Sequence, residues 1–476
     1  MKVERPLVEA LVKFAKKKPQ SFHVPGHKNG LISHLPYEIK KALQYDFTEL
    51  TGLDDLHHPE EVIHYAQKLL AKTYGAEHSY FLVNGSTVGN LAMVYATCKR
   101  GDKVLVQRNA HKSIFNALEL VEANPVYLAP EWDERTATAS YVSFETVKKA
   151  LHGEENVKAI ILTSPSYYGV VNQELLQIVE LAHAFNVPVL IDEAHGTHFA
   201  ASEKFPQSAL QIGADIVVQS AHKTLPAMTM ASFLHINSNI VTKEKVEHYL
   251  RMLQSSSPSY LLMASLDDAR AYVESYLESD AKYCIDKRNQ WIEAIKAIPD
   301  VEVIMVDDPL KLIIRVKGYT GSQIQESLEA EGLYVELADP LQVLAIVPLL
   351  KYGEVFDYAQ ARTNFKNAMV RLKSLKRAEI KLEKMIDSQK VSKPSLSLNQ
   401  IRSSQKEWIP YMRAIGEISS SMIIPYPPGI PLLLPGEKIT VAKLSQLEEL
   451  ILTGATFQGN HRLEEKLIEV ISEEKY

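Results

Sequence analysis

Short apolar runs recur along the first half of the chain and predict the strands of a covered, mostly parallel sheet. These runs lie at residues 78–83, 103–106, 159–163, 187–192 and 214–219. Segments with helical spacing of apolar residues separate them, which predicts a doubly wound α/β domain. Ligands bind beyond the carboxyl ends of the strands in such a sheet, so the residues that follow each strand are the candidates for chemistry.

A lysine after the last of these strands gives the strongest chemical signal. Lys223 closes the sequence Ser220-Ala221-His222-Lys223, which directly follows the strand. Burial disfavours the ammonium form of a lysine, so a buried amine can condense with an aldehyde such as pyridoxal phosphate (PLP). Ser220 and His222 offer polar side chains to a phosphate group. For an arbitrary His-Lys pair, a surface loop is the alternative interpretation.

Asp192 ends the strand at 187–192 and precedes a glycine turn at Gly196. In an open α/β sheet it would face the same crevice as Lys223. An aspartate that pairs with a pyridine nitrogen keeps that atom protonated, and the ring can then accept electrons from a developing carbanion. For a lone aspartate, the alternative interpretation is a helix N-cap.

The turn after the strand at 78–83 predicts a phosphate seat. Gly85, Ser86 and Thr87 stand at the start of an apolar helix. Glycine lets the backbone approach an anion, the hydroxyls donate hydrogen bonds, and the helix N-terminus presents free N–H groups. A simple capping turn is the alternative for this segment.

His111 lies in the loop that follows the strand at 103–106. An imidazole at this place could lie flat against a pyridine ring. The alternative is a polar surface residue with no ligand.

Taken together, these segments resemble the Orn/Lys/Arg decarboxylases of the PLP fold type I (aspartate aminotransferase-like) superfamily over nearly the whole chain. The motifs that carry the resemblance are His23-Val24-Pro25-Gly26-His27-Lys28-Asn29-Gly30, Thr48-Glu49-Leu50-Thr51-Gly52-Leu53-Asp54-Asp55-Leu56-His57, residues 84–87, 109–113, 192–198 and 220–223, Tyr426-Pro427-Pro428-Gly429-Ile430-Pro431, and Pro435-Gly436-Glu437. The resemblance implies an α/β large domain of PLP fold type I with smaller α+β domains toward the C-terminus. The match is to the short branch of the family, which lacks the N-terminal wing domain of the larger members.

The resemblance also implies roles for individual residues. Lys223 corresponds to the Schiff-base lysine, Asp192 to the partner of the pyridine nitrogen and His111 to the residue stacked on the ring. The phosphate is expected at the turn described above and at the lysine motif, that is, at Gly85, Ser86, Thr87, Ser220 and His222.

Two positions depart from the family pattern. Met230 stands where many members have glutamine, which weakens an inferred substrate. His195, an expected cofactor-binding residue, stands where the large inducible members have tryptophan, so the wall of the cofactor pocket differs from theirs.

The resemblance implies PLP-dependent decarboxylation of a basic amino acid, with arginine (to agmatine) favoured over lysine or ornithine. A fold-type I aminotransferase or another PLP-dependent lyase is the alternative, and Arg315 could then bind the substrate carboxylate. A non-catalytic PLP-holding protein is a third reading, although it would have no need of an electron sink at Asp192. The acidic pair Asp54-Asp55 could favour a cationic substrate, with helix capping as the preferred interpretation.

Composition restricts the class of protein further. The chain has 476 residues, of which 46% are hydrophobic and 23% charged, as expected for a soluble globular protein. A formal net charge of −6 argues against a nucleic-acid partner. The two cysteines, Cys98 and Cys284, lie far apart and predict reduced thiols in a cytoplasmic protein. We recognise no membrane span, signal peptide or complete set of metal ligands, so we expect neither a membrane nor a metal.

Changes in the pattern predict four parts of the chain. These are an N-terminal arm at 1–45, a PLP-binding large domain at 46–266, a linking helix with a small α/β domain at 267–375, and a C-terminal domain at 376–476. Within the small domain we expect strands at 301–305, 312–316 and 343–347 and a helix at 322–331.

We expect a homodimer, because a two-fold dimer is the commonest closed assembly and fold-type I sites often draw residues from both subunits. The segment from Ser255 to Tyr260 would then lie near the cofactor of the partner subunit. A monomer with a serine-rich linker at this place is the alternative.

Overall fold

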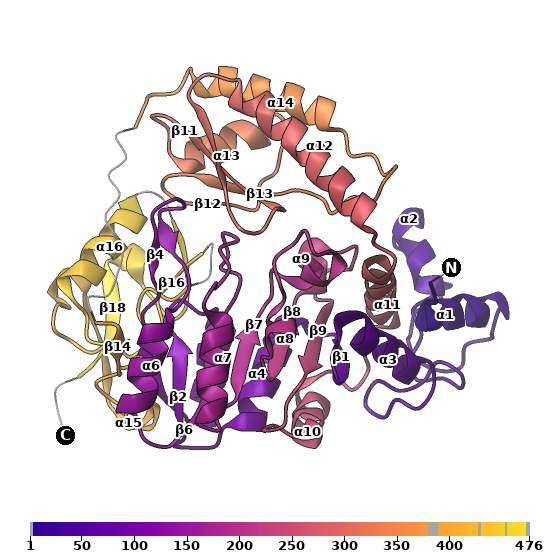
Figure 1. Cartoon of the computed structure of the whole chain (residues 1–476), viewed down its shortest axis with the longest axis horizontal. Helices are drawn as coiled ribbons and strands as arrows, with labels where there is room; N and C mark the ends of the chain where they lie inside the picture. Colours follow the sequence, from indigo (N-terminus) through magenta and orange to yellow (C-terminus); the bar gives the residue numbers. More distant parts are fainter. Residues whose placement is uncertain (1–2, 379–388, 427–429, 453–454, 473–476) are drawn as a thin grey trace. The chain divides into compact units, whose positions relative to one another are not determined.

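The computed structural model describes residues 3–378, 389–426, 430–452 and 455–472 (Figure 1). Its Cα positions divide into two compact units, Met1–Thr97 with Pro188–Ala281, and Cys98–Val187 with Lys282–Tyr476. Each unit has its own strands, helices and buried residues. No helix in these described ranges is long and apolar enough to cross a membrane.

The first unit contains a row of hydrogen-bonded strands in the order β1 (His78–Leu82), β9 (Ser232–Ile236), β8 (Ile216–Gln219) and β7 (Val189–Asp192). β7 and β8 are parallel, whereas β9 is antiparallel to both β1 and β8. Every residue of β7, β8 and β9 is buried, so both faces of these strands are covered. The sequence patterns at 78–83, 187–192 and 214–219 therefore correspond to strands.

The first unit also contains helices. They are α1 (Pro6–Lys16), α2 (Tyr37–Lys40), α3 (Val62–Tyr74), α4 (Gly85–Thr97), α8 (Ala209–Ile212), α9 (Ala221–Thr224), α10 (Lys243–Leu253) and α11 (Tyr260–Glu274), with 3₁₀ turns at η1 (Lys41–Gln44) and η2 (Thr197–Ala201). α4 packs on β8 and β9 and against α10.

A glycine in the first turns of α4 sets how closely this helix approaches the strands. A Cβ atom at Gly89 would lie 2.7 Å from both Leu82 Cδ1 and Val218 Cγ1. Non-bonded carbon atoms do not approach this closely, so a larger residue would push α4 away from the sheet. Gly89 thereby holds the start of α4 close to the end of β8.

The second unit contains the strand row β6 (Val157–Thr163), β2 (Lys103–Gln107), β3 (Asn124–Leu128) and β14 (Val391–Ser392). β2 is parallel to both β6 and β3, and β14 is antiparallel to β3. The remaining elements of this unit before residue 188 are α5 (Lys112–Val121), β4 (Trp132–Asp133), β5 (Thr138–Ala139), α6 (Phe144–Gly153) and α7 (Leu175–Ala184).

A separate antiparallel sheet follows the long helix α12 (Glu278–Lys296). Its strand order is β10 (Val301–Met305), β11 (Lys311–Val316), β13 (Val343–Ile346) and β12 (Leu337–Ala338), with helices α13 (Gly321–Glu329) and α14 (Tyr358–Leu372). The strands and the helix expected in this region are thus present, with ends that differ by no more than two residues.

The C-terminal part of the second unit has its own apolar core. It comprises α15 (Leu398–Ser403), the pair β15 (Lys406–Pro410) and β18 (Leu467–Ile471), the pair β16 (Ile424–Tyr426) and β17 (Thr456–Gln458), α16 (Val441–Leu452), and the 3₁₀ turns η3 (Tyr411–Arg413) and η4 (Leu463–Glu465). Buried side chains of this part, among them Ile423, Leu433 and Leu447, form one cluster. We call this part the C-terminal domain.

Candidate active site

Lys223 lies in the short helix α9, and a single residue, Ser220, separates this helix from β8. Its side chain is half-buried, and its Nζ atom is 2.9 Å from Nε2 of His195. His195 follows β7 and is 5% exposed. Two basic nitrogens at this distance can share one proton, so the pair can exchange a proton without the participation of water.

Asp192 is the last residue of β7 and is 3% exposed. Its Oδ2 atom accepts a hydrogen bond from Nδ2 of Asn90 at 2.9 Å, and its Oδ1 atom accepts one from the backbone N–H of Ala194 at 3.2 Å. Both of these donors are neutral. A cationic donor, such as a protonated pyridine nitrogen, would therefore be a favourable further partner for this buried side chain.

Hydroxyl groups gather at the N-terminus of α4. Oγ of Ser86 is 2.7 Å from Oγ of Ser220 and 3.2 Å from Oγ of Ser232. Gly85 has φ +74°, a conformation that favours glycine, and its N–H donates to the Met230 carbonyl. A helix of this length with three hydroxyls at its N-terminus has the chemistry of an anion seat.

The other predicted phosphate residues differ in their surroundings. Thr87 is exposed, and no hydrogen bond of its side chain is found within the described ranges. The ring of His222 is tied to the backbone, because its Nδ1 atom lies 3.0 Å from the Ala231 carbonyl oxygen. The structure thus brings Ser86 and Ser220 into direct contact, and His195 and Lys223 likewise.

His111 belongs to the second unit, where it is the N-cap of α5. Its Nδ1 atom is 2.8 Å from Oγ of Ser113 and accepts the backbone N–H of that residue at 3.3 Å. These contacts fix the orientation of the imidazole ring within its own loop.

Asp54 caps a helix, which is the role preferred above for the pair Asp54-Asp55. Its carboxylate accepts the backbone N–H groups of Glu60, Glu61, Ile63 and His64 at the start of α3. Burial raises the pKa of Asp54, but these backbone donors outweigh burial and hold the pKa below its usual range. The carboxylate is thereby committed to the helix.

The segment from Ser255 to Tyr260 packs against the start of α4 in its own chain. The backbone N–H of Ser255 donates to Oδ1 of Asn84 at 3.0 Å, and the buried hydroxyl of Tyr260 donates to the Asp54 carbonyl. Arg315, considered above for a substrate carboxylate, donates from Nε to Gln342 at 2.8 Å and from Nη2 to the Arg135 carbonyl at 2.9 Å.

Glu193, a buried carboxylate next to Asp192, was not predicted as a site residue from the sequence. Glu193 is 1% exposed and accepts hydrogen bonds from Ser208 Oγ, Ala209 N and Gln219 Nε2. Burial raises the pKa of Glu193 to about 7, although these three donors lower it. Glu193 thus links the end of β7 to the end of β8 and to the start of α8.

Asn90 also escaped the sequence analysis, although a signal for it was present. It lies four residues after Ser86 in the same helix, and residues at this spacing share a face. This spacing places Asn90 one helical turn beyond the phosphate candidate Ser86.

Comparisons with known proteins bear on this arrangement. Residues 5–306 match the family model described as Orn/Lys/Arg decarboxylase, major domain, and residues 378–458 match the model of the C-terminal domain of the same family. An uncharacterized protein of Bacillus subtilis is 42% identical, over 99% of both chains. An arginine decarboxylase of Bacillus anthracis is 34% identical, over 99% of this chain and 98% of the relative.

Solved structures with the same fold include a lysine decarboxylase from Francisella novicida. It superimposes with a TM-score of 0.79 at 20% identity, over 99% of this chain and 81% of the other. A serine palmitoyltransferase from Sphingomonas wittichii gives a TM-score of 0.53 at 15% identity, over 79% and 87% of the two chains. These likenesses confirm the predicted fold class. Pro427, Pro428 and Gly429 of the C-terminal motif lie outside the described residues.

Proposed function

This chain belongs to the Orn/Lys/Arg decarboxylase family and is an amino acid decarboxylase, and we propose that its cofactor is PLP and its substrate arginine, which it converts to agmatine. The contact between Lys223 and His195, beside the buried Asp192, is the observation that carries this proposal. Relatives named arginine decarboxylase support the choice of substrate, since they match at 34% identity over almost the whole chain. Relatives named lysine decarboxylase match at 24% identity or less.

The residues at the carboxyl ends of β7 and β8 fit PLP. Bound there, PLP would supply a ring that takes up the electron pair left when the α-carboxylate departs as carbon dioxide. Asp192 would accept a hydrogen bond from the protonated pyridine nitrogen, since its donors Asn90 and the Ala194 backbone are neutral and do not replace a cationic partner. Ser86, Ser220 and the N-terminus of α4 hold the phosphate.

Lys223 acts in two ways. As the neutral amine it would hold the aldehyde of PLP, a condensation that releases water, and His195, 2.9 Å away, can take up the proton of the lysine ammonium group. The free amine of Lys223 could also hold a proton for the α-carbon of the substrate, and His195 could resupply that proton. His111, by resemblance, stacks on the ring, while Gly85, Thr87 and His222 complete the surroundings of the phosphate.

Reduction with borohydride tests the tether. Wild-type protein loaded with PLP should yield one reduced, PLP-labelled peptide containing Lys223, and Lys223→Ala should yield none. Lys204→Ala, which changes an exposed lysine of the same unit, is the control and should label normally. A labelled peptide from another lysine in the Lys223→Ala protein would disprove the assignment.

An assay of carbon dioxide release with arginine, lysine and ornithine tests the substrate. We expect the highest kcat/KM for arginine, with agmatine as the product. The aminotransferase alternative predicts that a pyridoxamine form of the cofactor accumulates after turnover. The side-chain bonds of Arg315 to Gln342 and to the Arg135 carbonyl argue against that alternative. A protein that only holds PLP would release no carbon dioxide.

A homodimer in the cytoplasm completes the proposal. The N-terminal arm exposes many large apolar side chains, among them Phe22, Val24, Leu31, Ile32, Tyr37 and Ile39. Exposed apolar side chains are costly in water, and a second copy of the chain would cover them. We also propose that the chain has the four parts predicted from its sequence. In the dimer, the segment from Ser255 to Tyr260 would lie near the partner's cofactor. Light scattering tests it, because a monomeric mass for fully active protein would refute the dimer.

A further inference from the structure

A buried ion pair joins the C-terminal domain to the loop after β2. Nε and Nη2 of Arg108 donate to the two carboxylate oxygens of Glu437, each at 2.7 Å. Nη1 donates to the Pro431 carbonyl at 2.7 Å, and Nη2 also donates to the Leu432 carbonyl at 3.0 Å. The two side chains are only 10% and 8% exposed. The guanidinium is therefore enclosed by the C-terminal domain.

Contacts within the C-terminal domain hold the carboxylate of Glu437 in place. Glu437 also accepts the backbone N–H of Leu434 at 3.0 Å and Nζ of Lys443 at 2.8 Å. Burial raises the pKa of Glu437, but Arg108 and Lys443 outweigh burial and hold it below its usual range. Gly436 before it has φ +81°, and a Cβ atom there would lie 2.7 Å from the Leu396 carbonyl oxygen. The motif Pro435-Gly436-Glu437 is thus a turn that only glycine allows.

The loop held by this pair carries His111. Arg108 lies three residues before His111, and its backbone N–H donates to the Leu128 carbonyl at the end of β3. On the other side, Nζ of Lys112 donates to Oε1 of Gln458 in β17. The C-terminal domain therefore contacts the chain on both sides of His111.

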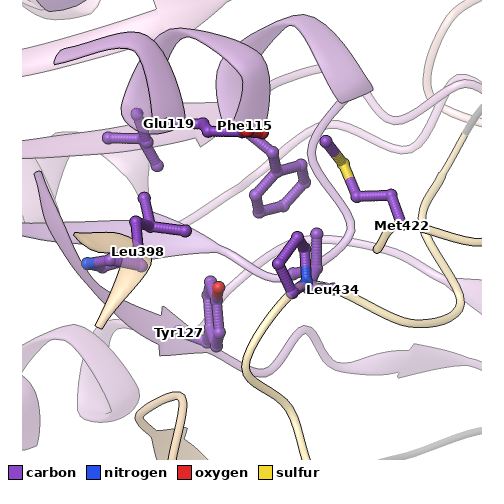
Figure 2. A pocket seen from close by; sticks show the side chains of 9 residues that line it. Phe115, Glu119, Tyr127, Leu398, Met422 and Leu434 are labelled. Atoms are coloured by element: carbon purple, nitrogen blue, oxygen red, sulfur yellow. The ribbon is translucent and has the colours of Figure 1, made fainter. Parts of the chain in front are cut away.

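Apolar side chains continue the contact along α5. Figure 2 shows Phe115 of α5 and Tyr127 of β3 facing Met422 and Leu434 of the C-terminal domain across a small pocket. The guanidinium carbon of Arg108 lies 5.9 Å from the centre of the Tyr127 ring. The ion pair and this apolar contact thus form one continuous interface.

We propose that Arg108 and Glu437 are positioning residues, through which the C-terminal domain fixes the place of His111. The inference rests on the proposed function, in which His111 stacks on the cofactor ring. A buried ion pair adds little net stability compared with apolar packing, because both charges lose their water. The rigid fork of arginine accepts a carboxylate in one bidentate geometry, so this pair defines the position of the loop.

The test measures the cofactor rather than turnover. Apo-protein is titrated with PLP, and the visible circular dichroism of bound PLP is recorded, since its strength reports how the ring is held. Glu437→Gln should weaken PLP binding about tenfold and reduce the dichroism, because a small misplacement of a contact residue is costly. Arg108→Lys keeps the charge but loses the fork, and should show a smaller change of the same kind.

Arg402→Gln is the matched control. Arg402 of the C-terminal domain pairs with Glu122 at the other end of α5, at 2.7 Å and with 60% of its side chain exposed. Loss of this exposed pair should leave PLP binding within about twofold of wild type. An equal effect of Arg402→Gln and Glu437→Gln would mean that any loosening of the domain matters, and would overturn the proposal.

A double-mutant cycle with His111→Ala decides whether the pair acts through His111. If it does, Glu437→Gln should add nothing further to PLP affinity or dichroism in the His111→Ala protein, and fully additive losses would overturn the proposal. If His111→Ala weakens PLP binding but Glu437→Gln does not, only the positioning role fails. If His111→Ala itself has no effect, the stacking role in the proposed function fails as well. Should Glu437→Gln not fold, Arg108→Lys takes its place in the cycle.

Discussion

Gly89→Ala should destabilise the protein and weaken PLP binding together, although glycine to alanine in a helix normally stabilises. The added Cβ would lie 2.7 Å from Leu82 Cδ1 and from Val218 Cγ1, both of which are fully buried. The valine cannot turn away readily, because its branched side chain is held in one rotamer. Either α4 or β8 must therefore move.

The expected magnitude follows from two opposing effects. Alanine is better than glycine in a helix interior by about 1 kcal/mol. Insertion of a methyl group into a packed core costs roughly 1–3 kcal/mol. The net change should be a loss of up to about 2 kcal/mol. Because Ser86 and Asn90 lie on either side of Gly89 in α4, the same shift displaces the phosphate seat and the partner of Asp192.

The measurement compares Gly89→Ala with Gly153→Ala. Gly153 is the last residue of α6, and a Cβ atom there would meet nothing within 4 Å. Thermal unfolding should show a lower midpoint for Gly89→Ala and no loss for Gly153→Ala, and PLP titration of the apo-proteins should follow the same order. If the two variants match in unfolding temperature and PLP affinity, close approach of α4 is not required and the reasoning is wrong.

Three further predictions concern carboxylates of the first unit. Asp192→Asn should still bind PLP but lose turnover by about a hundredfold in the carbon dioxide assay, because a neutral amide cannot keep the pyridine nitrogen protonated; near wild-type turnover would make Asp192 structural. The pKa of Glu193 rises from 4.5 to about 7 on folding, so its contribution to stability is complete below pH 4.5 and is lost as the pH rises to 7. That loss amounts to about 3 kcal/mol, and Glu193→Gln should flatten this part of the profile of unfolding temperature against pH. Asp54→Ala should cost about 1–2 kcal/mol of stability through the uncapped α3, a loss seen as a lower unfolding temperature. Asp55→Ala, which removes only a bond to the N–H of His57, should cost less, and equal losses would contradict the capping role.

The strands β2, β6, β7 and β8 could be predicted because each contains an unbroken run of apolar residues. β9 was missed for the opposite reason, since His235 interrupts its pattern. In the structure this histidine is fully buried and hydrogen-bonded to Ser79 and Gln219, and burial lowers its pKa to about 3. A neutral, fully bonded histidine can occupy a buried strand, but sequence alone does not show which partners satisfy it.

Some residues of the candidate site can be predicted from the local sequence, whereas others depend on contacts between distant parts of the chain. Lys223, Asp192 and Ser86 follow strands or begin a helix, so their positions can be predicted from short patterns. The ion pair of Arg108 and Glu437 joins residues 329 positions apart, and the local sequence around either residue does not indicate its partner. Such a contact depends on how a whole domain packs, which local periodicity does not determine.

The helix α4 connects the two ends of the proposed cofactor site. Ser86 contacts Ser220 of the lysine motif, and Asn90 contacts Asp192 at the end of β7. These two residues are four positions apart, so about one helical turn separates the hydroxyl from the amide. A helix is stiff over this length, which means that the spacing between phosphate seat and carboxylate is set by the backbone rather than by flexible side chains. Gly89 lies between them and fixes the distance of the turn from the strands. Changes at Ser86 or Asn90 should therefore affect one end of the site each, whereas a change at Gly89 should affect both.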